Sequence, residues 1–146
     1  MPVFFSFAQV REDLAKHTKG LAREQVWRIV GANSLGFQLK HIAGSVDRLT
    51  NYLMGEQVTP EQLAFLRRES SGTEDAAELL GLVEASLRRA EARLRQIQPE
   101  SIYEPRFVGR RALPTTVLGL LVHLAEHTQR HLGQAVTLSN IVRQTS

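Results

Sequence analysis

The stretch His123–Gln134, which reads HLAEHTQRHLGQ, carries three histidines at four-residue steps inside a long segment with helical apolar periodicity. On an α-helix, a step of four residues turns about 40° past a full turn and rises about 6 Å, so neighbouring histidines share a face. Two imidazoles on one face can bind a common metal ion. His123 and His131 would lie about 12 Å apart along the axis, so the ion must bind either His123 and His127 or His127 and His131.

The apolar periodicity of the same segment favours the second pair. Positions 120, 124, 127, 131, 134, 138 and 141 are spaced by 4, 3, 4, 3, 4 and 3 residues, which predicts one core-facing stripe interrupted by His127, His131 and Gln134. A buried imidazole costs roughly 1–3 kcal/mol unless its polar atoms are satisfied. A divalent ion satisfies both histidines, although core histidines bonded to carbonyls or to each other remain the alternative. His123 falls off the stripe and is expected at the surface.

Composition predicts one ordinary domain covering residues 1–146, with 42% hydrophobic and 23% charged residues. The net charge is +3, but Lys and Arg are scattered among Glu residues without a series of stacking aromatics, so nucleic acid is not expected as a partner. The absence of cysteine excludes disulfides, thiolate ligands and cysteine nucleophiles, and it fits a cytoplasmic location. No apolar run has the length of a membrane span, and no signal peptide is expected.

The helical pattern predicts four long helices and two short ones, and no strand. The expected ranges are 6–20 with Ser6 as N-cap, 22–29, 34–55, 59–69, 74–97 and 114–143, with a loop over 102–113. Thr59-Pro60-Glu61-Gln62 combines a capping box with a proline at the first helical position, and Ser71 with Glu74 offers a second capping box. We therefore expect an all-α fold, an antiparallel four-helix bundle with short extra helices in the connections.

A zinc site rarely rests on two protein ligands, so a third is required. Bundle sites draw their ligands from facing helices, which leaves His17, His41 and the carboxylates as candidates. Helical periodicity does not choose among them. It places His41 beside the apolar seam of the 34–55 helix, toward solvent.

Two segments, Ser34–Leu49 and Glu126–Gln134, resemble the DinB-like family of bacterial metal-binding four-helix bundles. In that family one histidine comes from the second helix, in a His-Ile-Ala-like context, and two come from a His-x-x-x-His-x-Gly-Gln motif on the last helix. The resemblance implies that His41, His127 and His131 bind one divalent ion. It further implies that Gly133 permits close helix approach and that Gln134 supports the ligands.

The resemblance also implies a chemistry. Three neutral histidines leave coordination positions open, as in catalytic zinc sites, and zinc or nickel is the expected metal. Such an ion lowers the pKa of bound water or holds a thiol as thiolate. The expected function is thus a metal-dependent enzyme of the thiol S-transferase or hydrolase type, acting on a small molecule with a low-molecular-weight thiol as co-substrate. Glu126 and Asp47 are candidate bases, unless they are ordinary surface charges.

Two alternatives assign the chain to other functional classes, a zinc peptidase and a non-catalytic binding protein. His123-x-x-Glu126-His127 matches the inverted zinc-peptidase pattern, in which both histidines bind zinc and the glutamate is the base. In the other alternative, the ion only holds the helices together and the bundle has a binding role. A homodimer is expected with either function. Replacing His123 and His131 separately distinguishes the peptidase from the three-histidine site, and exchangeable water on the ion distinguishes a catalyst from a staple.

Overall fold

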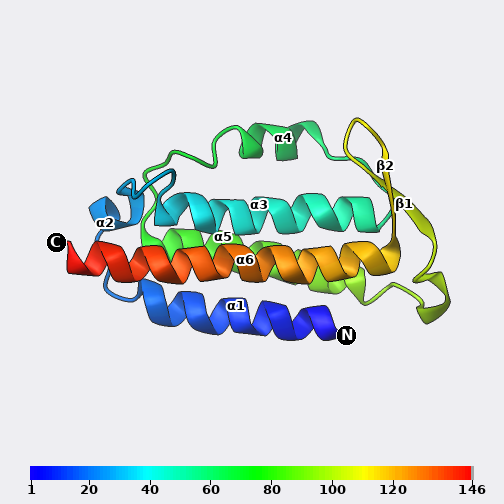
Figure 1. The fold of residues 1–146 in the computed structure, drawn as a ribbon, viewed down its shortest axis with the longest axis horizontal. Coiled ribbons are helices and arrows are strands. Elements are labelled where there is room, and N and C mark those ends of the chain that lie inside the picture. Colours follow the sequence, from blue (N-terminus) through cyan, green and yellow to red (C-terminus); the bar gives the residue numbers. More distant parts are fainter. Residues whose placement is uncertain (146) are drawn as a thin grey trace.

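The computed structural model describes residues 1–145, and its long helices lie side by side along a common direction (Figure 1). The elements, in chain order, are α1 (Pro2–Thr18), α2 (Arg23–Trp27), α3 (Leu35–Leu53), α4 (Pro60–Leu66), α5 (Ala76–Leu94), the 3-10 helix η1 (Pro99–Ser101), β1 (Pro105–Val108), β2 (Leu113–Thr116) and α6 (Val117–Gln144). The helices α1, α3, α5 and α6 enclose the core, and the short elements lie in the connections. The mostly helical fold class is as predicted.

A short hairpin stands where a loop was predicted. Strands β1 and β2 pair antiparallel, with Pro105 opposite Thr116 and Val108 opposite Leu113. The turn between them holds Gly109 at φ +73° and Ala112 at φ +48°, left-handed conformations that reverse the chain tightly. The expectation of no strand was therefore wrong, because four-residue strands are too short for an alternating pattern to stand out.

The directions of the long helices also differ from the expected antiparallel bundle. Helices α3 and α5 run parallel, since three hydrogen bonds join residues whose numbers rise together: Ala43 with Ser86, Asp47 with Arg89, and Asn51 with Arg93. Helices α1 and α6 run parallel as well, because Ser6 bonds to Ala125 and His17 to Arg143. The connection over residues 54–75, which contains α4, carries the chain back outside α3 before α5 begins (Figure 1). The antiparallel prediction thus fails for these two pairs.

The core-facing side of α6 is rotated away from the predicted stripe. Its buried residues are Val117, Leu120, Leu124, Thr128, Leu132, Ala135, Leu138, Ser139 and Val142. The predicted core positions His127 and His131 are only half-buried, and Gln134 is exposed. Because α6 packs against both α1 and α3, its buried face is centred between them, and the histidines lie on the flank toward α3.

One of the two predicted capping boxes is confirmed. Thr59 accepts a hydrogen bond from the Gln62 amide nitrogen, and the Gln62 side chain returns one to the Thr59 backbone. The second box is formed by Asp75 and Glu78 rather than by Ser71 and Glu74, so α5 begins later than predicted.

The first helix begins earlier than predicted. It starts at Pro2, where proline fits the first helical turn because its missing N–H needs no partner there. Ser6 lies inside the helix, and its hydroxyl bonds the Ala125 carbonyl of α6 instead of capping α1.

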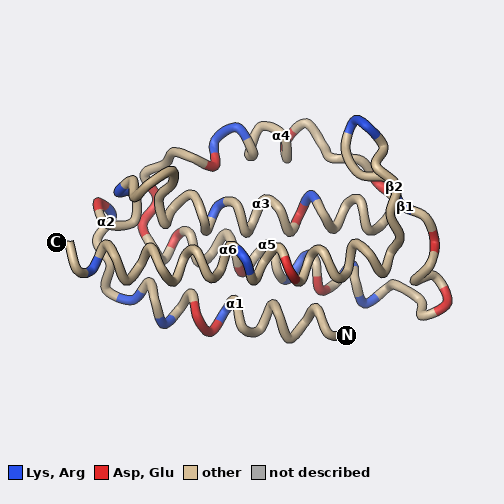
Figure 2. Tube along the Cα trace, in the orientation of Figure 1, with Lys and Arg blue, Asp and Glu red and all other residues tan. Residues whose placement is uncertain are grey.

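Charges of both signs are interspersed along the helices (Figure 2). Among the helices of residues 1–145, none combines the length and the apolar character that crossing a membrane requires.

Candidate metal centre

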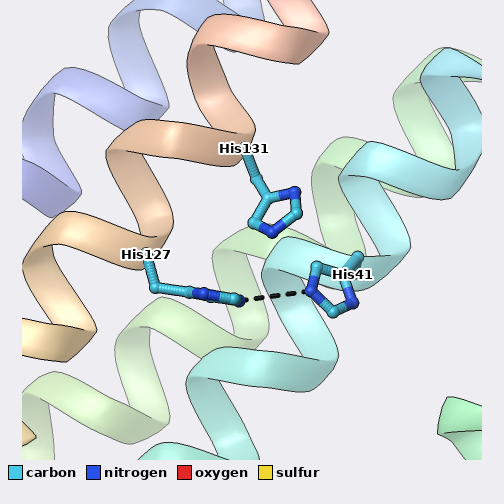
Figure 3. Close-up of side chains that lie close together, drawn as sticks. All are labelled: His41, His127 and His131. Carbon is cyan, nitrogen blue, oxygen red and sulfur yellow. Dashed lines mark hydrogen bonds between the residues drawn. The ribbon is translucent and has the colours of Figure 1, made fainter.

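The three histidines predicted as ligands lie together between α3 and α6 (Figure 3). His41 comes from α3, and His127 and His131 come from successive turns of α6. One ring nitrogen from each lies within 4.8 Å of the others, and the Nε2 atoms of His41 and His127 are 3.2 Å apart. The helices α3 and α6 run antiparallel, since Gln38 bonds Gln134 whereas His41, one turn later, bonds His127. His41, which helical periodicity placed toward solvent, has only 18% of its side chain exposed.

His41 is oriented by a buried carboxylate. Its Nδ1 lies 2.8 Å from Oε2 of Glu69, and Oε1 of Glu69 accepts a hydrogen bond of 2.8 Å from Arg48. An ionised carboxylate can only accept, so His41 carries its proton on Nδ1 and directs the lone pair of Nε2 toward the other histidines. Phe37 stacks on the His41 ring, with centroids 5.3 Å apart and 13° between the planes, and so restrains its tilt.

His131 is oriented by an amide. Its Nδ1 donates to Oε1 of Gln38 over 2.8 Å, and Nε2 of Gln38 donates to Oε1 of Gln134 over 2.8 Å. Gln134 thus bonds Gln38, which in turn bonds His131, and any support that Gln134 gives to the ligand passes through Gln38. With Nδ1 protonated, His131 also presents an Nε2 lone pair.

Burial keeps the two histidines of α6 neutral. It is the largest cause that lowers the pKa of His127 and of His131 to about 4, and the neighbouring His41 lowers both further. Neutral imidazole is the form that binds metal ions, so both side chains are available as ligands at pH 7.

The donor set fits a divalent ion. Two imidazole nitrogens on one tetrahedral zinc, with Zn–N bonds of about 2.05 Å, are separated by about 3.3 Å. The 3.2 Å between His41 and His127 is close to that separation. Nδ1 of His127 is buried and has no hydrogen-bond partner within residues 1–145, which leaves this ring the least constrained of the three. The three-histidine cluster is therefore compatible with metal binding.

The sequence model of one protein family, the DinB superfamily, matches residues 6–135 of the chain. The chain belongs to the DinB superfamily. DinB-like proteins bind metals, and all three histidines of the cluster fall within the matched range. No curated protein shows significant sequence similarity to the chain.

Other residues considered from the sequence lie outside this DinB centre. Glu126 pairs with Arg130 and, at 3.7 Å, with His123 on the surface of α6. Asp47 pairs with Arg89 of α5 over 2.7 Å. Both carboxylates are thus paired with basic neighbours, Glu126 exposed and Asp47 partly buried, and neither belongs to the three-histidine cluster.

His123 lies at the surface as predicted, with 49% of its side chain exposed. The peptidase pattern requires His123 as a ligand, but the cluster found among residues 1–145 contains His41 in its place. Gly133 is exposed, and a Cβ added there would meet no atom within 4 Å, so its predicted role in close helix approach was wrong. His17, the remaining candidate for the third ligand, lies in the last turn of α1 and is not part of the cluster.

Sequence reasoning missed the two side chains that orient the histidines. Gln38 sits one turn before His41 in the segment that carries the family resemblance, so its position was a usable signal. Glu69 lies shortly after α4 ends at Leu66, and no local pattern relates it to His41.

Proposed function

We propose that this DinB protein binds one divalent ion, zinc or nickel, through His41, His127 and His131 and uses it in a thiol S-transferase or hydrolase reaction. The observation that supports this is the convergence of three imidazoles from two antiparallel helices. Two of them are held with Nε2 toward the centre by Glu69 and Gln38. Three protein ligands leave coordination positions for a substrate, which is typical of catalytic rather than structural zinc sites.

An ion bound there supplies positive charge that favours the anionic forms of a thiol or of water. The protein contributes orientation and partial exclusion of solvent. Phe37 covers one face of His41, and the hydrogen bonds from His41 and His131 hold their rings in place before an ion arrives. This preorganisation reduces the cost of assembling the site.

A pocket of about 470 Å³ is linked to the centre through Gln38, which binds His131 and also lines the pocket, whereas none of the three histidines lines it. Its other lining residues are Val30, Ala32, Asn33, Arg130, Gly133, Gln134, Thr137 and Leu138. Amide groups and a guanidinium give this pocket hydrogen-bond donors for a small polar or anionic molecule. We assign it to the small-molecule substrate, with a low-molecular-weight thiol as co-substrate.

Cobalt substitution tests whether the ion takes exogenous ligands. Titrating 2-mercaptoethanol into the cobalt-loaded protein is expected to produce a thiolate-to-cobalt charge-transfer band in the near ultraviolet, because the cation favours thiolate. The band should be absent in His131→Ala treated identically. An unchanged cobalt spectrum, together with a lower unfolding temperature after metal removal, would favour a structural role for the ion instead of a catalytic one.

A homodimer is proposed from an apolar groove between the first turns of α1 and α6. The groove encloses about 420 Å³ and is lined mainly by Met1, Val3, Leu118, Leu121, Val122 and Ala125. Residues 1–10 and 117–125 carry no Lys, Arg, Asp or Glu, so this end of both helices is tan in Figure 2, although Glu126 also lines the groove. Phe5 of α1 is 79% exposed, and Val122 of α6 is 62% exposed. A second copy would cover these side chains and remove them from water.

Val122→Asp is expected to convert the dimer to a monomer, because it places a charge on an exposed residue that lines the apolar groove. Light scattering after size-exclusion chromatography measures the mass against the 16.4 kDa of one chain. Asn140→Asp adds the same charge at an exposed position of α6 and should leave the dimer intact. A wild-type protein that is monomeric at tens of micromolar would contradict the proposal.

A further inference from the structure

Glu69 is an unusual residue for its surroundings, since it is a carboxylate with only 1% of its surface exposed. A buried charge is costly unless it is paired and hydrogen-bonded. Its two oxygens have different partners on α3: Oε1 accepts from Arg48 and Oε2 accepts from His41. The ion pair with Arg48 compensates the charge, and the second oxygen is directed at a metal ligand.

Gly44 makes room for this carboxylate. It lies one turn after His41 on α3, and a Cβ added there would overlap Oε1 of Glu69. The same Cβ would lie 2.7 Å from Nη1 of Arg48 and 2.9 Å from Cδ1 of Phe65. Contacts under 3 Å are closer than carbon atoms tolerate, so a side chain at position 44 must displace the Glu69 carboxylate or its partners.

Glu69 belongs to the connection between α3 and α5, not to the helices that supply the ligands. The connection is also attached to α3 by Lys40, which pairs with Glu74 over 2.8 Å and donates to the Ser71 carbonyl. The connection therefore has attachments to α3 besides those of Glu69. Glu69 adds two contacts of its own, the ion pair with Arg48 and the hydrogen bond with Nδ1 of His41, and only the second reaches one of the three clustered histidines.

We propose that Glu69 is a positioning residue of the metal centre, and that Gly44 and Arg48 seat its carboxylate against His41. The carboxylate holds His41 as the Nδ1–H tautomer and fixes the ring so that Nε2 faces His127 and His131. Such outer partners of ligand histidines typically change metal affinity about 10- to 100-fold when removed. The role in metal binding rests on the proposed function, but the tautomer of His41 does not.

The first measurement uses metal-free protein labelled with ¹⁵N-histidine at pH 7.5. Long-range ¹H–¹⁵N spectra report which ring nitrogen carries the proton. The wild type should show His41 protonated on Nδ1, and Glu69→Ala should show both tautomers in exchange. A merely structural role for Glu69 would leave the His41 tautomer unchanged.

The second measurement is zinc affinity by competition with a chromogenic chelator. Glu69→Ala and Glu69→Gln should bind zinc about 10- to 100-fold more weakly than the wild type. Gly44→Ala should weaken binding in the same direction although it removes no polar group. Glu74→Gln is the matched control, because it loosens the same connection without touching His41, and its affinity should stay within threefold of the wild type.

Either of two results overturns the proposal: His41 keeps its proton on Nδ1 in both Glu69 variants, or these variants lose no more zinc affinity than Glu74→Gln. Should the wild type itself bind no divalent ion, the proposed function fails. The spectra of the metal-free variants would still decide whether Glu69 sets the tautomer of His41.

Discussion

Replacing His131 or His127 with alanine is expected to abolish tight binding of a divalent ion. The free energy of zinc binding at sites with four protein ligands is about 10–16 kcal/mol, which is about 2.5–4 kcal/mol for each ligand. Losing one ligand is therefore expected to lower the affinity roughly 10²- to 10³-fold. Each variant removes one of the three nitrogens that lie within 4.8 Å of one another. Metal analysis of the purified protein and chelator competition measure the loss, and the wild type should hold one ion per chain.

His123→Ala is the control for this experiment. It removes an exposed imidazole from the same helix, one turn before His127, and should leave most of the affinity. The opposite pattern, with binding lost in His123→Ala and kept in His131→Ala, would restore the peptidase arrangement and refute the three-histidine site.

The metal-free protein is expected to lose stability steeply as the pH falls from about 6.5 to about 4. Burial lowers the pKa of His127 and His131 to about 4 in the folded protein, whereas an unfolded histidine has a pKa near 6.5. Between these values the unfolded chain binds protons that the folded chain does not, so falling pH favours unfolding. Above about pH 6.5 both states are neutral and below about pH 4 both are protonated, so the contribution stops changing. Both rings are half-buried, so solvent reduces the effect.

Urea unfolding in the presence of a chelator at several pH values measures this dependence. The double variant His127→Gln, His131→Gln lacks both titrating groups and should show a flatter decline over the same range. A decline as steep as that of the wild type would mean that other groups cause it. Saturating zinc should oppose the decline, because an ion that binds only the folded state stabilises it by mass action.

Local sequence patterns were sufficient to predict many of the helices and part of the three-histidine site. The capping box of Thr59 and Gln62 and the long helical segments follow from neighbours within a few turns. The four-residue spacing places His127 on one face with either His123 or His131, and the apolar periodicity of the segment favoured His131. The third histidine of the cluster was reached only through the family resemblance, because periodicity placed His41 toward solvent.

Tertiary structure alone decided how these elements meet. The parallel course of α3 and α5 depends on the long connection over residues 54–75, and the rotation of α6 depends on packing against two helices at once. The partners of the histidines are equally non-local: His41 bonds a residue 28 positions away, and His131 bonds one 93 positions away. Periodicity reports which side of a helix is apolar but not which helix will cover it. The sequence by itself therefore determined the helices and the α6 histidine pair, whereas helix packing placed His41, Glu69 and Gln38 around that pair.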